Sequence, residues 1–227
     1  MTYLSSRSVL DEIASHGIDV FDINDLVKIY GKPKSYVSKV LSRSKNVNRL
    51  ERGKYFFVGA DFYEIASNIV FPSYVSLLPA FSYYGLTEQE PVVFSIVSLK
   101  RHKNMVAEGK KIEFLSIRRD RFFGYKKNNN AFIAEPEKAI LDALYFNRLA
   151  FSYTEEAVKN GIDAGVLDAT KLKEYALRFK SSTLINKVGF ILESNDIDAV
   201  DLLPYISKAY IRIHANGRTN KRWRVVI

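Results

Sequence analysis

The sequence contains no cysteine, which excludes disulfide bonds, thiolate-ligated metal ions and cysteine nucleophiles. Histidine is also scarce: His16, His102 and His214 lie far apart along the chain and give no basis for a histidine-built metal or catalytic site. No apolar run reaches the roughly 18 residues of a membrane-spanning helix, and the first residues lack the pattern of a secretion signal. We therefore expect a soluble cytoplasmic protein with no metal ion, no cofactor and no membrane contact.

Common catalytic motifs are missing as well, because the chain has no glycine-rich phosphate loop and no nucleophile elbow. Four residues of the segment AEPEKAILDALYF, namely Glu135, Glu137, Lys138 and Asp142, resemble the acids and lysine of metal-dependent nucleases. However, two glutamates at a helix start suit the positive end of the helix dipole, and Lys138–Asp142 has the spacing of an i, i+4 pair. We expect these residues to be structural and the protein not to be an enzyme.

The composition is that of an ordinary globular protein with a strongly basic balance. Its 227 residues suffice for one large or two small domains, and 47% of them are hydrophobic. The formal net charge is +9 and the isoelectric point is near 9.5, which favours a polyanionic partner.

Residues 32–58, KPKSYVSKVLSRSKNVNRLERGKYFFV, predict a short helix followed by a tight hairpin. Val37, Val40 and Leu41 form one narrow apolar stripe at helical spacing, and Pro33 requires a turn before the helix. Residues 48–50 and 55–58 resemble two short strands around a four-residue turn. Gly53 supplies the positive φ that such a turn commonly needs.

The charge of this segment changes abruptly relative to what precedes it. Residues 32–58 carry eight basic residues and one acid, whereas residues 1–31 carry two basic residues and five acids. Helices are also expected to begin near Ser6 and at residues 23–30, so three helices precede a basic β-hairpin. This order predicts a DNA-binding winged helix-turn-helix. The competing interpretation is that these cations merely solvate a surface.

The hypothesis assigns two roles to the basic and hydroxyl side chains of this segment. Those on the free face of the helix would contact base edges in the major groove, and those of the hairpin would hold the backbone or minor groove. The first group is Lys34, Ser35, Tyr36, Lys39 and Arg43, and the second is Arg49, Arg52 and Lys54.

The rest of the chain predicts a mixed α/β domain, so that the whole protein belongs to the α+β class. The predicted domains are the winged helix (1–60), a connecting helix or linker (61–75) and a second domain (76–227). Expected helices are 60–70, 76–84, one starting at Pro136, 154–159, 170–178 and 182–193; expected strands are 92–99, 111–117, 122–125 and 131–134, with a terminal hairpin around Asn216-Gly217. Tyr83 and Tyr84 are expected to be core residues.

Four segments in order resemble the AbiEi family: RLERGKYFFV, YVSLLPAFSYYGLTEQEP, AEPEKAILDALY and the terminal RWRVVI. Members of this family are antitoxins and transcriptional regulators of AbiE-type toxin–antitoxin systems. The resemblance implies that the N-terminal domain binds inverted repeats in its own promoter as an autorepressor, with two protomers on a two-fold operator. It also implies that the second domain counteracts a nucleotidyltransferase-like toxin in a type IV arrangement, where stable toxin binding is not required.

Two further basic clusters, at residues 100–127 and 208–227, supply the candidate antitoxin surface: Arg118, Arg119, Arg121, Arg222 and Arg224. These clusters either contact nucleic acid or are the solvated edges of a sheet. Two other functions stay open. One is a winged-helix regulator whose second domain senses a ligand or dimerises without a toxin partner, and the other is a module that uses its winged helix for protein contacts.

Overall fold

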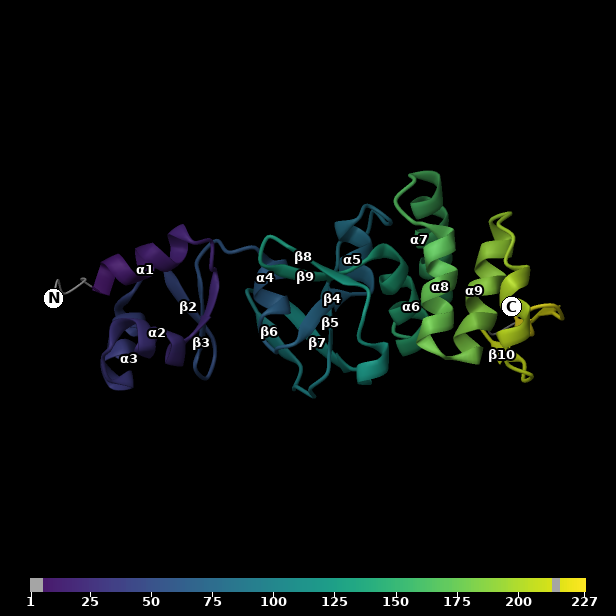
Figure 1. Cartoon of the computed structure of the whole chain (residues 1–227). Helices are drawn as coiled ribbons and strands as arrows, with labels where there is room; N and C mark the ends of the chain where they lie inside the picture. The colour runs from purple at the N-terminus through teal and green to yellow at the C-terminus, as the bar shows by residue number, and fades with distance from the viewer. Residues whose placement is uncertain (1–5, 214–216) are drawn as a thin grey trace.

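The computed structural model describes residues 6–213 and 217–227 of the chain. The elements form an elongated molecule with a small N-terminal unit at one end, a six-stranded sheet in the middle and a layer of helices at the other end (Figure 1). Helices and strands follow one another along the chain without a regular repeat, and the central sheet is mixed, which confirms the predicted α+β class. None of the helices in the described ranges has the length and apolar character needed to cross a membrane.

The N-terminal unit contains three helices and a three-stranded antiparallel sheet in the order β1-β3-β2. Its elements are α1 (Ser6–Ser15), β1 (Val20–Asp22), α2 (Ile23–Tyr30), α3 (Lys34–Arg43), β2 (Val47–Glu51) and β3 (Lys54–Phe57). Asp22 caps α2 by accepting a hydrogen bond from the Asn24 amide at 2.7 Å, and Gly31 ends the helix in the left-handed region. Gly53 has a φ of +89° in the hairpin turn, as predicted.

The apolar stripe of α3 holds this helix against the rest of the N-terminal unit. Val37 and Leu41 are buried among residues of α1, α2 and β1, and Val40 packs at the edge of the same cluster. Burial of such side chains stabilises the helix by about 1.5–3 kcal/mol each, which a ten-residue helix needs because its backbone alone is marginally stable. The predicted stripe is confirmed.

The central sheet has six strands in the order β6-β7-β5-β4-β9-β8. Strand β4 is antiparallel to β5 and parallel to β9, β5 is parallel to β7, and the two edge strands are antiparallel to their neighbours. Its elements are α4 (Phe62–Ser67), β4 (Ser73–Ser76), α5 (Leu78–Tyr83), β5 (Val93–Ser98), β6 (Met105–Ala107), β7 (Lys110–Ser116), η1 (Arg119–Arg121), β8 (Tyr125–Asn128), β9 (Ala131–Ala134) and α6 (Pro136–Phe146).

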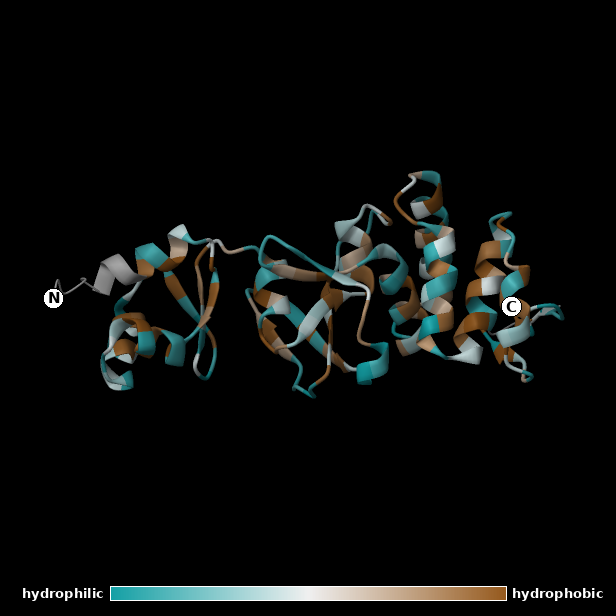
Figure 2. Ribbon diagram, viewed as in Figure 1, coloured by the Kyte–Doolittle hydropathy of each residue, from teal (hydrophilic) through white to brown (hydrophobic). Residues whose placement is uncertain are grey.

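Helices cover both faces of this sheet. Tyr74 belongs to the hydrophobic cluster on the α6 side and its neighbour Val75 to the cluster on the α4 side, as the alternation of a strand requires. Figure 2 shows hydrophobic residues along the middle of the sheet. Every residue of α6 from Pro136 to Leu144 is buried, because α6 lies between the sheet and the terminal helices.

The sequence did not predict the central strand β4. Its residues were assigned partly to a linker (61–75) and partly to a helix beginning at Ser76, yet α4 packs on the sheet and β4 is one of its inner strands. The predicted helix 60–70 is shorter, the predicted strand 122–125 lies at Tyr125–Asn128, and β6 was missed. The boundary between the two units therefore falls near residue 60.

The C-terminal layer is built around α9. Its elements are α7 (Phe151–Asp163), α8 (Ala169–Phe179), α9 (Ser182–Ser194), η2 (Val200–Tyr205), β10 (Ile211–Arg212), β11 (Thr219–Asn220) and β12 (Val225–Val226). Strand β12 pairs in parallel with β10 and antiparallel with β11, which differs from the predicted simple hairpin; Asn216 lies outside the described residues. Trp223 is fully buried over Gly189 and donates its Nε1–H to Glu193 at 2.6 Å.

Polar contacts connect the N-terminal unit to the sheet. The Asp19 amide donates to Glu64 Oε1 at 3.0 Å, and His102 Nε2 lies 3.1 Å from Glu51 Oε2. Further hydrogen bonds cross the junction from Asn48 to Glu108, from Asn130 to the Gly17 carbonyl, and from Lys54 to the Asn68 and Ile69 carbonyls. Apolar contact is provided by Leu50, which packs against the hydrophobic cluster on the α4 side of the sheet.

Candidate nucleic-acid interface

Helix α3 presents the predicted polar residues to solvent. Its buried stripe fixes the rotation of the helix, so the opposite arc faces outward. Tyr36 is 43% exposed, which shows that even the aromatic member of this group is accessible. The exposed residues of this arc are Lys34, Ser35, Tyr36, Ser38, Lys39, Ser42 and Arg43. None of the five side chains predicted for the major groove is covered by the second domain.

The N-terminal half of α3 and the β2–β3 hairpin enclose a hollow of about 410 Å³. In Figure 1, α3 and the hairpin turn lie on the same lower side of the N-terminal unit. Lys34 and Ser35 line the hollow from the helix, and Arg49 and Arg52 line it from the hairpin. Four of the eight predicted residues, distant by up to 18 positions in sequence, thus share one concave surface.

Four polar residues that line this hollow were absent from the predicted site: Asp22, Asn24, Ser38 and Tyr55. Ser38 stands one helical turn after Ser35, and its place on the free face was readable from the helical period. Asn24 accepts a hydrogen bond from Lys34 Nζ at 3.0 Å and so restrains that cation. Nothing in the local sequence marks Asn24, because it lies on α2.

Lys54 is placed differently from the other predicted cations. Its Nζ donates to the Ile69 carbonyl and lies 3.8 Å from Glu51 Oε1, and its side chain is 25% exposed. The pairing of β2 with β3 shifts register between Arg49 and Glu51. As a result, Glu51 and Lys54 contact the second domain, whereas Arg49 faces the hollow. Lys54 therefore belongs to the junction between the units rather than to the exposed basic surface.

The five arginines proposed for the antitoxin surface differ in accessibility. Arg118, Arg119 and Arg222 are exposed, although Arg118 pairs with Asp120 at 3.3 Å, whereas Arg121 and Arg224 are half-buried. Three of the five bind distant residues of the chain: Arg121 Nε donates to the Phe179 carbonyl at 3.0 Å, Arg222 Nη1 lies 2.7 Å from Glu193 Oε1, and Arg224 Nη1 donates to the Ser207 carbonyl at 3.2 Å. Arg121 thus joins η1 to the end of α8, and Arg222 and Arg224 bind within the C-terminal layer.

The acids at the start of α6 do more than face the helix dipole. Glu135 is almost buried and binds Lys126 at 2.7 Å, Lys171 at 3.1 Å and the Tyr175 hydroxyl. Burial alone would raise the pKa of Glu135, but these three donors outweigh it and lower the pKa from 4.5 to about 2. Across residues 6–213 and 217–227, no three His, Asp or Glu side chains are arranged to hold a metal ion.

We predict that Glu135→Gln lowers the free energy of unfolding by about 1–3 kcal/mol at neutral pH. The depressed pKa stabilises the folded state fully above about 4.5, and this contribution is lost as the pH falls from 4.5 through about 2. Urea unfolding at several pH values should show the difference from the native protein shrinking over that interval. Glu156→Gln, on the exposed face of α7, is the control and should show no such trend.

Lys138 and Asp142 form the i, i+4 pair that their spacing predicted, and this ion pair is fully buried. Both side chains have no solvent exposure, and Asp142 Oδ2 also accepts hydrogen bonds from Ser76 Oγ at 2.9 Å and Tyr74 Oη at 3.1 Å. Burial lowers the pKa of Lys138 and raises that of Asp142, while their mutual attraction opposes both shifts. The pair is enclosed by protein and has no access to a substrate.

Comparisons with known proteins support the fold only. No protein-family model and no curated protein matches the sequence. Among solved structures, the RV2827C protein from Mycobacterium tuberculosis is similar with a TM-score of 0.65 at 13% sequence identity. The match covers 96% of this chain and 89% of that chain. The order of the N-terminal unit, sheet and helical layer therefore occurs in another protein.

Proposed function

We propose that the protein is a DNA-binding repressor that uses an N-terminal winged helix-turn-helix. The observation that carries this proposal is the basic surface shared by α3 and the β2–β3 hairpin, where Lys34, Ser35, Arg49 and Arg52 line one hollow. An exposed helix face with hydroxyls and cations suits base edges in the major groove. Arginines on the adjoining hairpin suit the phosphate backbone.

The order of elements in the N-terminal unit supports the same proposal. Two helices precede α3, and a hairpin follows it in a three-stranded sheet, which is the order of a winged helix-turn-helix. In that arrangement α3 is the recognition helix and β2–β3 is the wing. Because the second domain leaves Tyr36, Lys39 and Arg43 exposed, DNA can approach α3 without any rearrangement of the two units.

We further propose that the repressor is the antitoxin of an AbiE-like system, acting against a nucleotidyltransferase-like toxin. This part rests on the resemblance of four segments to the AbiEi family and on the presence of a second domain of suitable size. Arg118, Arg119 and Arg222 are the exposed arginines of the candidate antitoxin surface, and Arg222 is also paired with Glu193. Two protomers would bind an operator made of inverted repeats.

Fluorescence anisotropy with DNA from the protein's own promoter tests the repressor. We expect affinity at least about 10³-fold higher than for a shuffled sequence at the same salt concentration. Equal affinity for the two DNAs would contradict sequence-specific repression. Failure to bind either DNA at moderate salt would instead favour a module for protein contacts.

Co-expression with a neighbouring nucleotidyltransferase-like gene tests the antitoxin. The full chain is expected to restore growth, and so is the double variant Arg49→Ala/Arg52→Ala, because DNA binding and antitoxicity would reside in different domains. Loss of rescue in that variant would contradict the division of roles. A genomic neighbourhood without such a gene would favour a regulator that senses a ligand, for which the pocket described next is the candidate site.

A further inference from the structure

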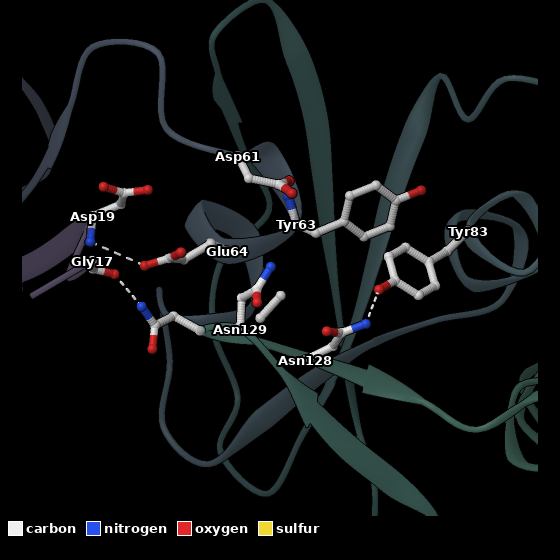
Figure 3. Close-up of a pocket in the computed structure, with 10 residues that line it drawn as sticks. Gly17, Asp19, Asp61, Tyr63, Glu64, Tyr83, Asn128 and Asn129 are labelled. Carbon is white, nitrogen blue, oxygen red and sulfur yellow. Dashed lines mark hydrogen bonds between the residues drawn. The ribbon is translucent and has the colours of Figure 1, made fainter.

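A pocket of about 420 Å³ lies where the N-terminal unit meets the sheet (Figure 3). Gly17 and Asp19 line it from the loop before β1, while Tyr63 and Glu64 line it from α4. Tyr83 of α5 and the turn between β8 and β9 complete the walls. The volume is within the range of small-molecule sites, and pockets of this kind commonly occur between domains.

The pocket is acidic although the chain is basic. Asp19, Asp61 and Glu64 line it together with three asparagine amides, and no lysine or arginine is among the lining residues in the part of the chain that the structure describes. Lys127 acts on Glu64 through space but is exposed and stands outside the pocket wall. The electrostatic character of the pocket therefore favours a positively charged occupant.

Glu64 is the residue that points most directly to a ligand. Its side chain belongs to a residue only 6% exposed, and Oε1 accepts a hydrogen bond from the Asp19 amide. Within the described residues, no donor is bonded to the second oxygen, Oε2, which Figure 3 shows turned away from that amide. Burial, with lesser contributions from Asp19 and Asp61, raises the pKa of Glu64. Oε2 is open to the pocket and not sealed inside the protein, and a positively charged donor entering the pocket would stabilise this carboxylate.

Two tyrosine rings form the other wall. The ring centroids of Tyr63 and Tyr83 are 5.2 Å apart with an interplanar angle of 59°. Tyr63 donates its hydroxyl hydrogen to the Pro79 carbonyl at 3.0 Å, and Asn128 binds the Tyr83 hydroxyl, so both rings are held in place. Aromatic faces attract ammonium and guanidinium groups, and they also pack against an alkyl chain.

We propose that this junction pocket binds a small organic cation, an alkyl amine or alkyl guanidine, with its charged group at Glu64 and its carbon chain against Tyr63 and Tyr83. A metal ion is disfavoured, because no three acidic or histidine side chains among the described residues are arranged to hold one. Since Gly17 and Asp19 belong to the N-terminal unit and Glu64 and Tyr83 to the sheet domain, the bound cation bridges the two units. The proposal goes beyond DNA binding and does not depend on it.

Isothermal titration calorimetry of the full chain with agmatine tests this site, and 1,5-pentanediol serves as an uncharged probe of similar length. We expect saturable binding of one agmatine per chain and no binding of the diol. Glu64→Gln keeps an oxygen to accept from the Asp19 amide but removes the charge, so it should weaken agmatine binding about tenfold or more. Glu174→Gln makes the same charge change on the exposed face of α8 and should bind as the native protein does.

A second variant covers the case in which Glu64→Gln disturbs folding, which thermal unfolding would reveal. Tyr83→Leu removes one ring at a residue that is 38% exposed, and it should also weaken agmatine binding. Absence of binding to the native chain at millimolar agmatine, or binding that both pocket variants leave unchanged, would overturn the proposal. No promoter DNA enters this experiment, so its failure is distinguishable from failure of the repressor assignment.

Discussion

Replacing Lys138 with methionine should lower the free energy of unfolding by about 3–5 kcal/mol. The substitution would leave Asp142 fully buried without its cation, and the hydroxyls of Ser76 and Tyr74 would be its remaining donors. The lysine Nζ also lies 5.2 Å from the ring centroid of Phe179, so a favourable contact with an aromatic face is lost as well. Urea unfolding followed by circular dichroism measures the effect.

The double variant Lys138→Met/Asp142→Asn separates loss of an ion pair from loss of packing. The asparagine side chain is neutral and can still accept from the two hydroxyls, so we expect the double variant to be more stable than Lys138→Met alone. Lys28→Met is the control: it breaks the exposed ion pair with Asp25 and should lower the free energy of unfolding by less than about 1 kcal/mol. A double variant no more stable than the single variant would show that buried charge is not the main cost.

The basic surface predicts two distinguishable kinds of DNA-binding defect. Lys39→Ala or Arg43→Ala should weaken the free energy of binding to promoter DNA by about 1–3 kcal/mol, as expected for contacts to base edges. The same variants should change binding to shuffled DNA little. Arg52→Ala should weaken binding to promoter and shuffled DNA equally, and it should reduce the slope of log affinity against log salt concentration by about one. Anisotropy titrations on both DNAs at several salt concentrations would measure these quantities.

Lys54→Ala provides a sharp contrast to Arg52→Ala, because both remove one positive charge from the same hairpin. Lys54 is bonded to the Ile69 carbonyl at the junction, so its loss should leave the salt slope unchanged. Lys159→Ala on α7 is a control for net charge alone. The same defect from Lys39→Ala and Arg52→Ala would refute the assignment of α3 to base edges and the hairpin to phosphates.

The N-terminal unit could be predicted from sequence because its signals are local. The helical spacing of Val37 and Leu41, and a glycine at the turn of the hairpin, correctly located α3 and the β2–β3 turn. The direction of Lys54 was not predictable, since it depends on a register shift in the opposite strand. Tertiary contacts decide on which side of the hairpin the side chains after such a shift lie, and local sequence does not record those contacts.

The central strand β4 was missed because two of its four residues are serines, which are usually exposed. Both are satisfied inside the protein: Ser73 Oγ donates to the Ser67 carbonyl at 2.8 Å, and Ser76 Oγ donates to Asp142. The burial of Lys138 was unpredictable for a similar reason, because the i, i+4 spacing is the same for an exposed and a buried pair. Partners distant in sequence decide these cases.

The junction pocket left no sequence signal at all. Its walls come from four separate segments, around residues 17–19, 61–64, 83 and 128–131, and each is unremarkable in isolation. Tyr83 was expected to be a core residue but is partly exposed at this pocket. Only the packing of the N-terminal unit against the sheet brings these side chains together.

The stacking of Trp223 over Gly189 gives the protein an internal optical reporter. Trp223 is the single tryptophan of the chain, and it joins the last strand to α9 through an enclosed, hydrogen-bonded indole. Its fluorescence emission should move to longer wavelength when the terminal segment leaves α9 and water reaches the ring. Comparing that signal with circular dichroism during denaturation would show whether the helical end separates from the sheet before the whole molecule unfolds.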